Sequence, residues 1–356
     1  MSDVELVARR AGLQHLGGDR PGIRRRRRGK GFSYVRDGSR RPLTQADRER
    51  ISTLAIPPAW TDVWIAPEAD AHLQATGVDA AGRKQYLYHP AWTEASAADK
   101  FEHLATVAER LPRLRQRVAV DLADDGPERG LATVVRLIDR GLIRPGSDRA
   151  SDAVGATTLQ AEHVEIDRGR IVLDFVGKSA VEQHIEIEDP DLADALTALL
   201  ARSSFADVQI FAACVDQAID ASRVNRYLAE ATGASVTAKD LRTWGASAAA
   251  VECLCDPLGG ACDEPTQALR QMYVDVSERL GNTVAVCRSS YVAPLVVDAY
   301  EAGRLIREWQ RSRAGRWMSR PERALARLLS AEQRSGPATR LRLGRRTERA
   351  GSPGSR

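Results

Sequence analysis

The spacing of apolar residues changes once along the chain, and this change constrains the fold more than any other feature. Between Phe32 and Trp92, short runs such as "FSYV", "VWIAP", "HLQATGVD" and "KQYLYHP" predict strands, and "LTQADRERISTLA" predicts one helix. After Pro90–Thr93, apolar residues recur every three or four positions, which predicts amphipathic helices. A chain of 356 residues with 43% hydrophobic content can form two cored domains.

The helical region is interrupted once. "GATTLQ", "HVEIDRGRIVLDFVGKSA" and "QHIEIED" predict a small antiparallel sheet, after which helices resume at about Asp191 and continue past Leu305. Thr237 is expected to cap the helix that contains "KDLRTWGASAAAVECL". Residues 303–330 are expected to form one or two basic amphipathic helices. The expected fold class is α+β, with a small strand-rich N-terminal domain and a mainly α-helical domain that contains the small sheet.

Basic residues are concentrated in two blocks. One is "RPGIRRRRRGK", and the other runs from Arg311 to Arg356 with 13 Arg and 3 Glu, although the whole chain carries only +4. Such blocks favour a polyanion such as nucleic acid, but solvated disordered tails have the same composition. We therefore expect four parts: a basic arm (1–30), a strand-rich domain (31–92), a helical domain (93–312) and a partly disordered Arg-rich extension (313–356).

Several classes of protein are disfavoured. The sequence has no apolar run of about 18 residues and no signal-peptide pattern, which predicts a soluble cytoplasmic protein. Cys253, Cys255 and Cys262 lie close together without a histidine or fourth cysteine, so buried small residues are favoured over a zinc site. A Walker-type loop and an acidic metal cluster are also lacking, and we expect neither metal nor cofactor.

Lysine is rare in this chain. Of 52 basic residues only five are lysine, namely Lys30, Lys84, Lys100, Lys178 and Lys239. Arginine cannot release its proton near neutral pH, whereas a lysine can be tuned to do so. Each lysine is therefore a candidate for proton transfer, with chance retention as the alternative.

The stretch "GNTVAVCRSSYVAP" holds four candidate nucleophiles, Cys287, Ser289, Ser290 and Tyr291. In reversible attack on a phosphodiester the nucleophile must also be able to leave, and a phenol with a pKa of about 10 leaves far better than a serine alkoxide. A thiolate suits irreversible hydrolysis. We therefore favour Tyr291 and interpret the other three as packing residues that set it at the start of a helix. An ordinary hydroxyl-rich turn is the alternative.

Phosphodiester chemistry needs further groups. Guanidinium forks hold non-bridging oxygens best, and the leaving alkoxide needs a proton donor. Arg144 is expected to end an apolar helix, Lys178 follows a strand at a turn that its preceding glycine permits, and Arg242 lies in the first turns of a helix. Asn282 could donate an amide hydrogen bond to a phosphate oxygen. Taken singly, each residue also has an ordinary structural explanation.

The order of these motifs resembles that of type IB DNA topoisomerases, the compact kind found in poxviruses and bacteria. "GKGFSYVRDG", "AIPPAWTDVWI" and "LQATGVDAAGRKQYLYHPAW" resemble the DNA-clamping domain, and "DFVGK", "KDLRTWG" and "LGNTVAVCRSSY" resemble the catalytic domain. The resemblance covers roughly Pro21 to Arg313. It implies the tyrosine recombinase/topoisomerase IB catalytic fold and a monomeric enzyme that relaxes double-stranded DNA at the nucleoid, without ATP or metal.

The resemblance also implies roles for individual residues. Tyr291 would form a 3′-phosphotyrosyl link, Arg144 and Arg242 would grip the phosphate, and Lys178 would protonate the leaving 5′-oxygen. Asn282, where viral members have a histidine, would donate a hydrogen bond. The residues expected to contact DNA are Arg83, Lys84, Gln85, Tyr86, Tyr88, Lys239 and Arg288.

Two alternatives stay open. A tyrosine recombinase shares this chemistry, but such enzymes usually have H-x-x-R where this chain has "KDLR", and their N-terminal domain is helical. A catalytically impaired DNA-binding homologue is the other, because "RPGSDRASDAVGATTL" is shorter than the family's R-I-G-N-E segment and lacks its tyrosine. In addition, Pro145 disfavours helical geometry at Arg144, and "LQAEHV" stands where basic residues are more usual.

Overall fold

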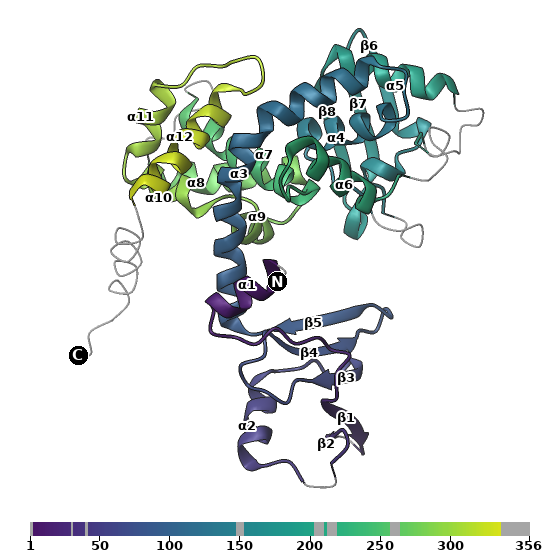
Figure 1. Cartoon of the computed structure of the whole chain (residues 1–356), viewed down its shortest axis with the longest axis vertical. Coiled ribbons are helices and arrows are strands. Elements are labelled where there is room, and N and C mark those ends of the chain that lie inside the picture. Colours follow the sequence, from purple (N-terminus) through teal and green to yellow (C-terminus); the bar gives the residue numbers. More distant parts are fainter. Residues whose placement is uncertain are drawn as a thin grey trace. The chain divides into compact units, whose positions relative to one another are not determined.

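The structure is a computed structural model that describes residues 3–29, 31–39, 42–146, 153–202, 210–211, 219–256 and 264–335. The chain forms two compact units, Met1–Phe101 and Glu102–Arg356, which we describe separately (Figure 1). The sequence placed the boundary at residue 92, within the first turn of the long helix α3 (Pro90–Ala123), whereas the first unit continues along α3 to Phe101. Trp92, near the start of α3, packs edge-on against His72 of the first unit, with ring centroids 4.9 Å apart.

The first unit is built on a five-stranded antiparallel sheet. Its strand order is β2-β1-β3-β4-β5. The elements are α1 (Asp3–Arg10), β1 (Ile23–Arg28), β2 (Gly31–Arg36), α2 (Gln45–Thr53), β3 (Thr61–Ile65), β4 (Leu73–Val78) and β5 (Lys84–Tyr88). The strands and the helix predicted from the sequence between Phe32 and Trp92 are thereby confirmed.

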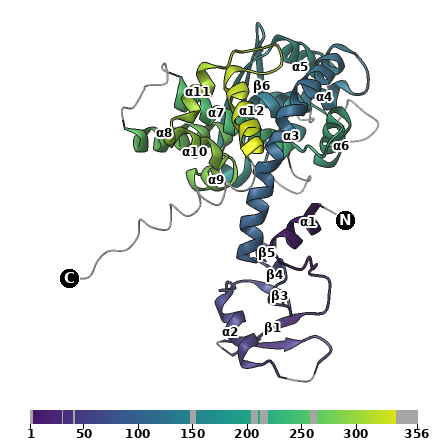
Figure 2. The same ribbon diagram turned by 60° about the vertical axis from the view of Figure 1, so that its left-hand side comes forward.

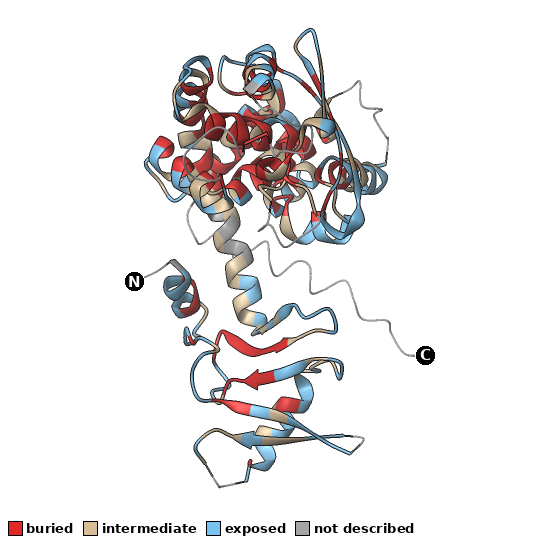
Figure 3. Cartoon of the chain, turned by 90° about the vertical axis from the view of Figure 1, so that its right-hand side faces the viewer, coloured by how far each residue is buried: buried red, intermediate tan, exposed pale blue. Residues whose placement is uncertain are grey.

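Both faces of this sheet are partly covered, because successive side chains of a strand point to opposite faces. Ile65 belongs to one buried cluster, together with Ile51 of α2. Its neighbour Trp64 belongs to a second buried cluster on the other face, together with Leu16 from the segment that precedes β1. Figure 3 shows these buried positions along the strands.

The predicted basic arm is wrong as a separate part. Residues 1–30 contain α1 and the strand β1, and β1 pairs with both β2 and β3. An arginine-rich segment can form a strand here because Ile23 is buried while four of the five following arginines stay exposed.

The second unit is mainly helical (Figure 2). Its described residues include one three-stranded antiparallel sheet in the order β6-β7-β8. Its longer helices are α4 (Arg129–Gly141), α5 (Pro190–Arg202), α6 (Ala221–Thr232), α7 (Ala238–Cys255), α8 (Pro265–Leu280), α9 (Val284–Ser290), α10 (Pro294–Glu301), α11 (Arg304–Gln310) and α12 (Arg320–Ser335). The strands are β6 (Val164–Asp167), β7 (Arg170–Val176) and β8 (Glu182–Glu188), and the 3₁₀ turns are η1 (Ala156–Thr158), η2 (Ala161–His163) and η3 (Lys178–Ala180).

The α+β fold class is confirmed, with one local error. "GATTLQ" forms the turn η1 rather than a strand, because its backbone bonds to the segment after α4 instead of to a neighbouring strand. Helix α7 is the centre of this unit and packs against α4, α6, α8, α10, α11 and α12. Thr237 caps α7 as predicted, since its side chain accepts a hydrogen bond from the Asp240 amide.

The predicted end of the helical domain at residue 312 is wrong. Helix α12 lies beyond it and buries Ala324, Leu325, Leu328 and Leu329. The unit therefore continues to at least residue 335. The disorder expected for the extension falls mostly on residues 336–356, which lie outside the described residues.

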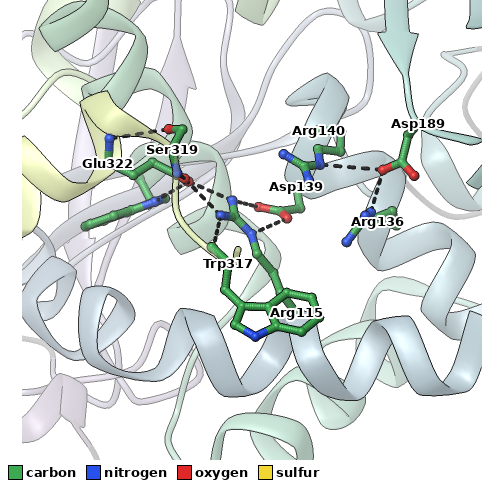
Figure 4. A network of polar contacts seen from close by, with 9 residues as sticks. Arg115, Arg136, Asp139, Arg140, Asp189, Trp317, Ser319 and Glu322 are labelled. Atoms are coloured by element: carbon green, nitrogen blue, oxygen red, sulfur yellow. Dashed lines mark hydrogen bonds and ion pairs between the residues drawn. The ribbon is translucent and has the colours of Figure 1, made fainter. Parts of the chain in front are cut away.

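A buried polar network fixes α12 to the rest of the unit (Figure 4). Arg115 of α3 donates two hydrogen bonds to Asp139 of α4, both 2.8 Å, and two to Glu322 of α12, of 2.6 and 2.9 Å. The indole of Trp244 in α7 also donates to Glu322, at 3.0 Å. One buried network therefore joins four helices, with Arg115 bound to α4 and α12 and Glu322 bound to α7.

The opposite charges of this network stabilise one another. Burial alone would raise the pKa of Asp139 and of Glu322, but the Arg115 guanidinium outweighs burial and holds both pKa values below their ordinary range. The two carboxylates in turn raise the pKa of Arg115, against the effect of burial. All three groups are therefore charged at neutral pH.

Candidate active site

Arg242 lies on the first turns of α7 and is almost fully buried. Its Nε donates to the carbonyl of Leu142 at 2.7 Å, and its Nη2 donates to the carbonyl of Leu280 at 3.0 Å. Its Nη1 donates to the hydroxyl of Tyr291 at 2.8 Å. The two carbonyls fix the plane of the guanidinium, so that its Nη1 group points at the Tyr291 hydroxyl.

The carbonyl of Leu142 is within reach because of two backbone features. Leu142 ends α4 in the left-handed region, with φ of 52°. Gly245 faces it from α7, and a Cβ at that glycine would lie 2.2 Å from Leu142 Cδ2. A β-carbon at position 245 would displace the Leu142 side chain, and glycine avoids this displacement.

Burial lowers the pKa of Arg242 to about 10, the nearby charge of Arg144 lowers it as well, and the contact with Tyr291 raises it. The guanidinium therefore remains protonated at neutral pH. It lies 5.0 Å from the centre of the Tyr291 ring and is a fixed positive charge beside this phenol.

Tyr291 lies at the C-terminal end of α9, and α10 begins three residues later at Pro294. The prediction that it begins a helix is wrong, because "VAVCRSS" itself forms α9. Its backbone is held by Ser247 of α7, whose hydroxyl donates to the Tyr291 carbonyl at 3.1 Å and accepts from the Ala293 amide at 3.0 Å. No sequence pattern pointed to Ser247, which stands in a run of small residues.

Of the other three candidate nucleophiles, Ser290 lines the same cleft as Tyr291, whereas Cys287 and Ser289 do not. Cys287 is fully buried, and burial raises the pKa of its thiol to about 11, so it stays protonated at neutral pH. Ser289 is exposed, and its hydroxyl lies 3.2 Å from that of Ser290.

Arg144 lies three residues beyond the end of α4, so the prediction that it ends the helix is wrong. Its backbone is nevertheless fixed, since its carbonyl accepts from the Ala156 amide at 2.8 Å. The two segments touch at Gly155, where a Cβ would lie 2.5 Å from the Gly146 backbone and 2.8 Å from the Arg144 carbonyl. Pro145 thus follows a non-helical arginine, as its own geometry requires.

Asn282 follows Gly281, the left-handed residue with φ of 59° that ends α8. Its side-chain oxygen accepts a hydrogen bond from Arg144 Nη2. Its Nδ2 is buried and has no hydrogen-bond partner among the residues the structure describes. The amide therefore orients Arg144 while keeping a donor available.

These side chains line one cleft of about 710 Å³. Its lining includes Arg144, Lys178, Lys239, Asn282 and Tyr291. The structure thus brings the predicted nucleophile, Tyr291, together with four other predicted site residues: Arg144, Lys178, Lys239 and Asn282. Arg242 reaches the same tyrosine from the core.

Lys178 is exposed on the loop between β7 and β8, as predicted. The predicted role of the preceding glycine is wrong, because Gly177 has an ordinary φ of −88°. The left-handed residues of this loop are Ser179 and Ala180, with φ of 66° and 57°.

The residues of the first unit that were predicted to contact DNA differ in exposure, because successive side chains of β5 point to opposite faces of the sheet. Lys84, Tyr86 and Tyr88 are exposed on β5, and the two tyrosine rings stack with centroids 6.2 Å apart. Arg83 and Gln85 instead hydrogen-bond the carboxylate of Asp79.

In the second unit, Arg288 lies outside the cleft lining. It is exposed on α9 with its guanidinium 5.7 Å from the centre of the Tyr273 ring.

Over the described ranges, no group of three His, Cys, Asp or Glu side chains could hold a metal ion. Cys253 and Cys255 are free thiols whose pKa values burial raises, whereas Cys262 lies outside the described residues. Within that same part of the chain, no helix is long and apolar enough to cross a membrane.

The match to known families distinguishes a topoisomerase from a tyrosine recombinase. Residues 89–300, more than half of the chain, match the model of the eukaryotic DNA topoisomerase I catalytic core. The chain belongs to the type IB DNA topoisomerase family. Residues 31–79 match the N-terminal domain of bacterial DNA topoisomerase IB. The predicted resemblance to this family, rather than to tyrosine recombinases, is confirmed, and the chain is classed as a DNA-acting enzyme.

Individual relatives agree with this assignment to the topoisomerase family. A protein named DNA topoisomerase 1B, from Acanthamoeba polyphaga mimivirus, is 27% identical over 294 residues, which cover 79% of this chain and 88% of the relative. A structure of the XerH site-specific recombinase bound to palindromic difH substrate, in a post-cleavage complex, covers 54% of this chain and 51% of its own. Its TM-score is 0.37 at 12% identity, a likeness too limited to bear on the fold.

Proposed function

We propose that this topoisomerase relaxes supercoiled duplex DNA by reversible cleavage of one strand, with Tyr291 as the nucleophile. The observation that carries this proposal is the hydrogen bond from buried Arg242 to the Tyr291 hydroxyl, at the wall of a cleft that also contains Arg144, Lys178 and Asn282. This cleft combines a phenol, two guanidinium groups and an amine, which are the groups that phosphodiester exchange requires.

In the first step, Tyr291 Oη attacks the scissile phosphorus. A bond forms between phosphorus and Oη, and the bond between phosphorus and the 5′-oxygen breaks. Arg144, Arg242 and the free Nδ2 of Asn282 donate to the non-bridging oxygens, where negative charge develops. Lys178 gives its proton to the leaving 5′-oxygen, and the phenol proton is released to solvent.

The second step is the reverse of the first. The free 5′-hydroxyl attacks the phosphotyrosyl diester, and the phenolate leaves. Because the diester keeps the energy of the original bond, resealing requires neither ATP nor metal. Between the two steps the free end of the duplex swivels, which removes supercoils of either sign.

Duplex DNA is the partner in this proposal. Lys84, Tyr86 and Tyr88 of β5 would contact it in the first unit, and Lys239 and Arg288 in the second. Phosphate contacts of this kind position the duplex without reading its sequence, and their strength falls with salt. We propose that the enzyme acts as a monomer on DNA in the cytoplasm.

The test is relaxation of supercoiled plasmid with EDTA present and ATP absent. Wild type should relax the plasmid and, after denaturation with detergent, remain covalently attached to a 3′ end. Tyr291→Phe should do neither, although it keeps the ring that packs beside Arg242. A wild-type protein that leaves the plasmid supercoiled would support the impaired-homologue alternative, and relaxation by Tyr291→Phe would exclude Tyr291.

The role of Lys178 can be tested separately. A 5′-bridging phosphorothiolate leaves as a thiolate, which does not need a proton. Lys178→Ala should therefore slow cleavage of an ordinary substrate far more than cleavage of the phosphorothiolate. An equal defect on both substrates would contradict the role as general acid.

A further inference from the structure

The five-arginine strand β1 lies outside both matched family ranges, since the N-terminal model begins at residue 31. Its pairing with β3 is limited to two residues, Ile23 and Arg24. Its pairing with β2 continues to Arg28, opposite Gly31. Residues 25–28 and 31–34 therefore form a two-stranded ribbon that continues past the paired part of β3.

The arginines of this ribbon have unequal roles. Arg25 is bound internally, because its guanidinium donates to the carbonyls of Ile56, Pro57 and Trp60 and lies 4.2 Å from the centre of the Phe32 ring. Arg24 forms an ion pair with Asp37 at 3.2 Å.

Arg26, Arg27 and Arg28 are all exposed, and across the described part of the first unit their side chains form neither hydrogen bonds nor ion pairs. The sequence from Arg20 to Arg36 contains no Asp or Glu. Such a concentration of like charge repels itself. Asp37, which pairs with Arg24, offsets part of this charge and also interacts electrostatically with Arg26. The ribbon thus presents three cations that form neither hydrogen bonds nor ion pairs within the described part of the first unit.

The strand register relates these cations to β5. Residues paired across antiparallel strands share a face, and the pairs Arg24–Trp64, Trp64–Thr76 and Thr76–Tyr86 cross the sheet in sequence. By the two-residue period, Arg26 and Arg28 therefore share a face with Lys84, Tyr86 and Tyr88.

Arg27 lies on the other face of the ribbon. On the shared face, Trp64 lies buried with Leu16 between the two groups of residues, which makes the ribbon a separate patch.

We propose that the β1–β2 ribbon binds the backbone phosphates of duplex DNA through Arg26, Arg27 and Arg28. The inference rests on the proposed function for the identity of the polyanion. A guanidinium fork matches a phosphate better than any other side chain. Two paired strands are also narrow enough to enter a major groove about 12 Å wide, and arginines on both faces can then reach phosphates on both of its walls.

The test is the salt dependence of DNA binding. The Tyr291→Phe chain, which cannot cleave, is titrated into a fluorescein-labelled duplex, and Kd is measured by anisotropy between about 50 and 200 mM salt. Each phosphate contact contributes about 0.9 to the slope of log K against log salt. Arg26→Gln should therefore lower the slope by about 0.9, and the triple variant of Arg26, Arg27 and Arg28 to Gln by two to three times as much.

Arg48→Gln is the matched control. Arg48 is equally charged and exposed, but it lies on α2, which packs against the face of the sheet opposite to that of Arg26. It should leave the slope unchanged. Equal slopes for Arg26→Gln and Arg48→Gln would overturn the inference, because the arginines would then act only through net charge.

Two further arms separate the possible failures. The triple variant to Lys keeps the charges and should retain most of the slope, whereas a slope as low as that of the Gln variant would indicate damage to the fold and overturn the inference. Wild type, assayed in parallel, should relax plasmid DNA. If it does not, the proposed function fails, whereas relaxation with unchanged slopes refutes the phosphate-binding ribbon alone.

Discussion

Replacement of Glu322 by Ala should destabilise the helical unit strongly, although the residue lies outside the matched catalytic core. The change removes two hydrogen bonds from Arg115, one from the Trp244 indole and one of 2.7 Å from the Ser319 amide. Trp244 is only 1% exposed, so water cannot replace the lost acceptor. The indole N–H is then buried without a partner, which costs about 1–3 kcal/mol.

Loss of one member of a buried ion pair costs about 3–5 kcal/mol. Asp139 still holds Arg115 by two hydrogen bonds, so the lower end, about 3 kcal/mol, applies here. For a unit of this size that corresponds to a decrease in Tm of roughly 6–12 °C. The assay is urea unfolding followed by circular dichroism, with the unfolding free energy extrapolated to water.

Glu332→Ala is the matched control on the same helix. Glu332 pairs with Arg304 at 3.9 Å, and its side chain is 27% exposed, so its loss should cost under about 1 kcal/mol. Equal losses for Glu322→Ala and Glu332→Ala would refute the view that the buried network fixes α12. A loss below about 1 kcal/mol at Glu322 would refute it as well.

Three further predictions concern the same unit. Ser247→Ala should lower the unfolding free energy by about 1–3 kcal/mol, because the Ala293 amide loses its acceptor, and should slow cleavage; an unchanged single-turnover rate would remove Ser247 from the positioning of Tyr291. Gly155→Ala should reduce the cleavage rate on the order of 10²-fold by displacing the Arg144 backbone, with circular dichroism to show that the fold persists; full activity would contradict the close packing there. Because the pKa values of Asp139 and Glu322 are depressed, their contribution to stability is present above the ordinary carboxyl pKa of about 4 and is lost as pH falls through the folded values. Urea unfolding at pH 7 and pH 3 should therefore show a smaller loss of unfolding free energy at the lower pH for Glu322→Gln than for wild type. Equal losses would contradict the depressed pKa of Glu322 in the folded protein.

Residue type and local periodicity were sufficient for much of the fold. The strands β2 to β8, the cap at Thr237 and the position of Lys178 between two strands follow from patterns of a few residues, whereas β1 was expected to be part of an extended basic arm. The course of the backbone at Arg144 did not, because it depends on contact with Gly155, across a stretch that no periodic pattern describes. The end of the helical domain was missed for a related reason. An arginine-rich helix has the composition of a solvated tail, and only its contact with Arg115 shows that it is part of the core.

For the candidate site, the sequence could nominate residue types with the required chemistry but could not show which of them meet. Ser247 was missed because a hydroxyl that binds backbone atoms leaves no chemical signature in the sequence. Asn282 was expected to donate a hydrogen bond, but its oxygen also accepts from Arg144. Arg144 and Asn282 are 138 positions apart and Ser247 and Tyr291 are 44 apart, so both pairings depend on tertiary structure.

The contact between Arg115 and Glu322 has a consequence for how the protein is made. The two residues are 207 positions apart in sequence. At about 5–20 residues per second, a ribosome needs roughly 10–40 s to proceed from one to the other. By the end of that interval the nascent chain contains Arg242, Tyr291 and every other residue of the cleft. Until Glu322 is added, it lacks the carboxylate that joins α12 to the Trp244 indole of α7. The buried network that joins α3, α4, α7 and α12 can therefore form only after all residues of the cleft have been synthesised.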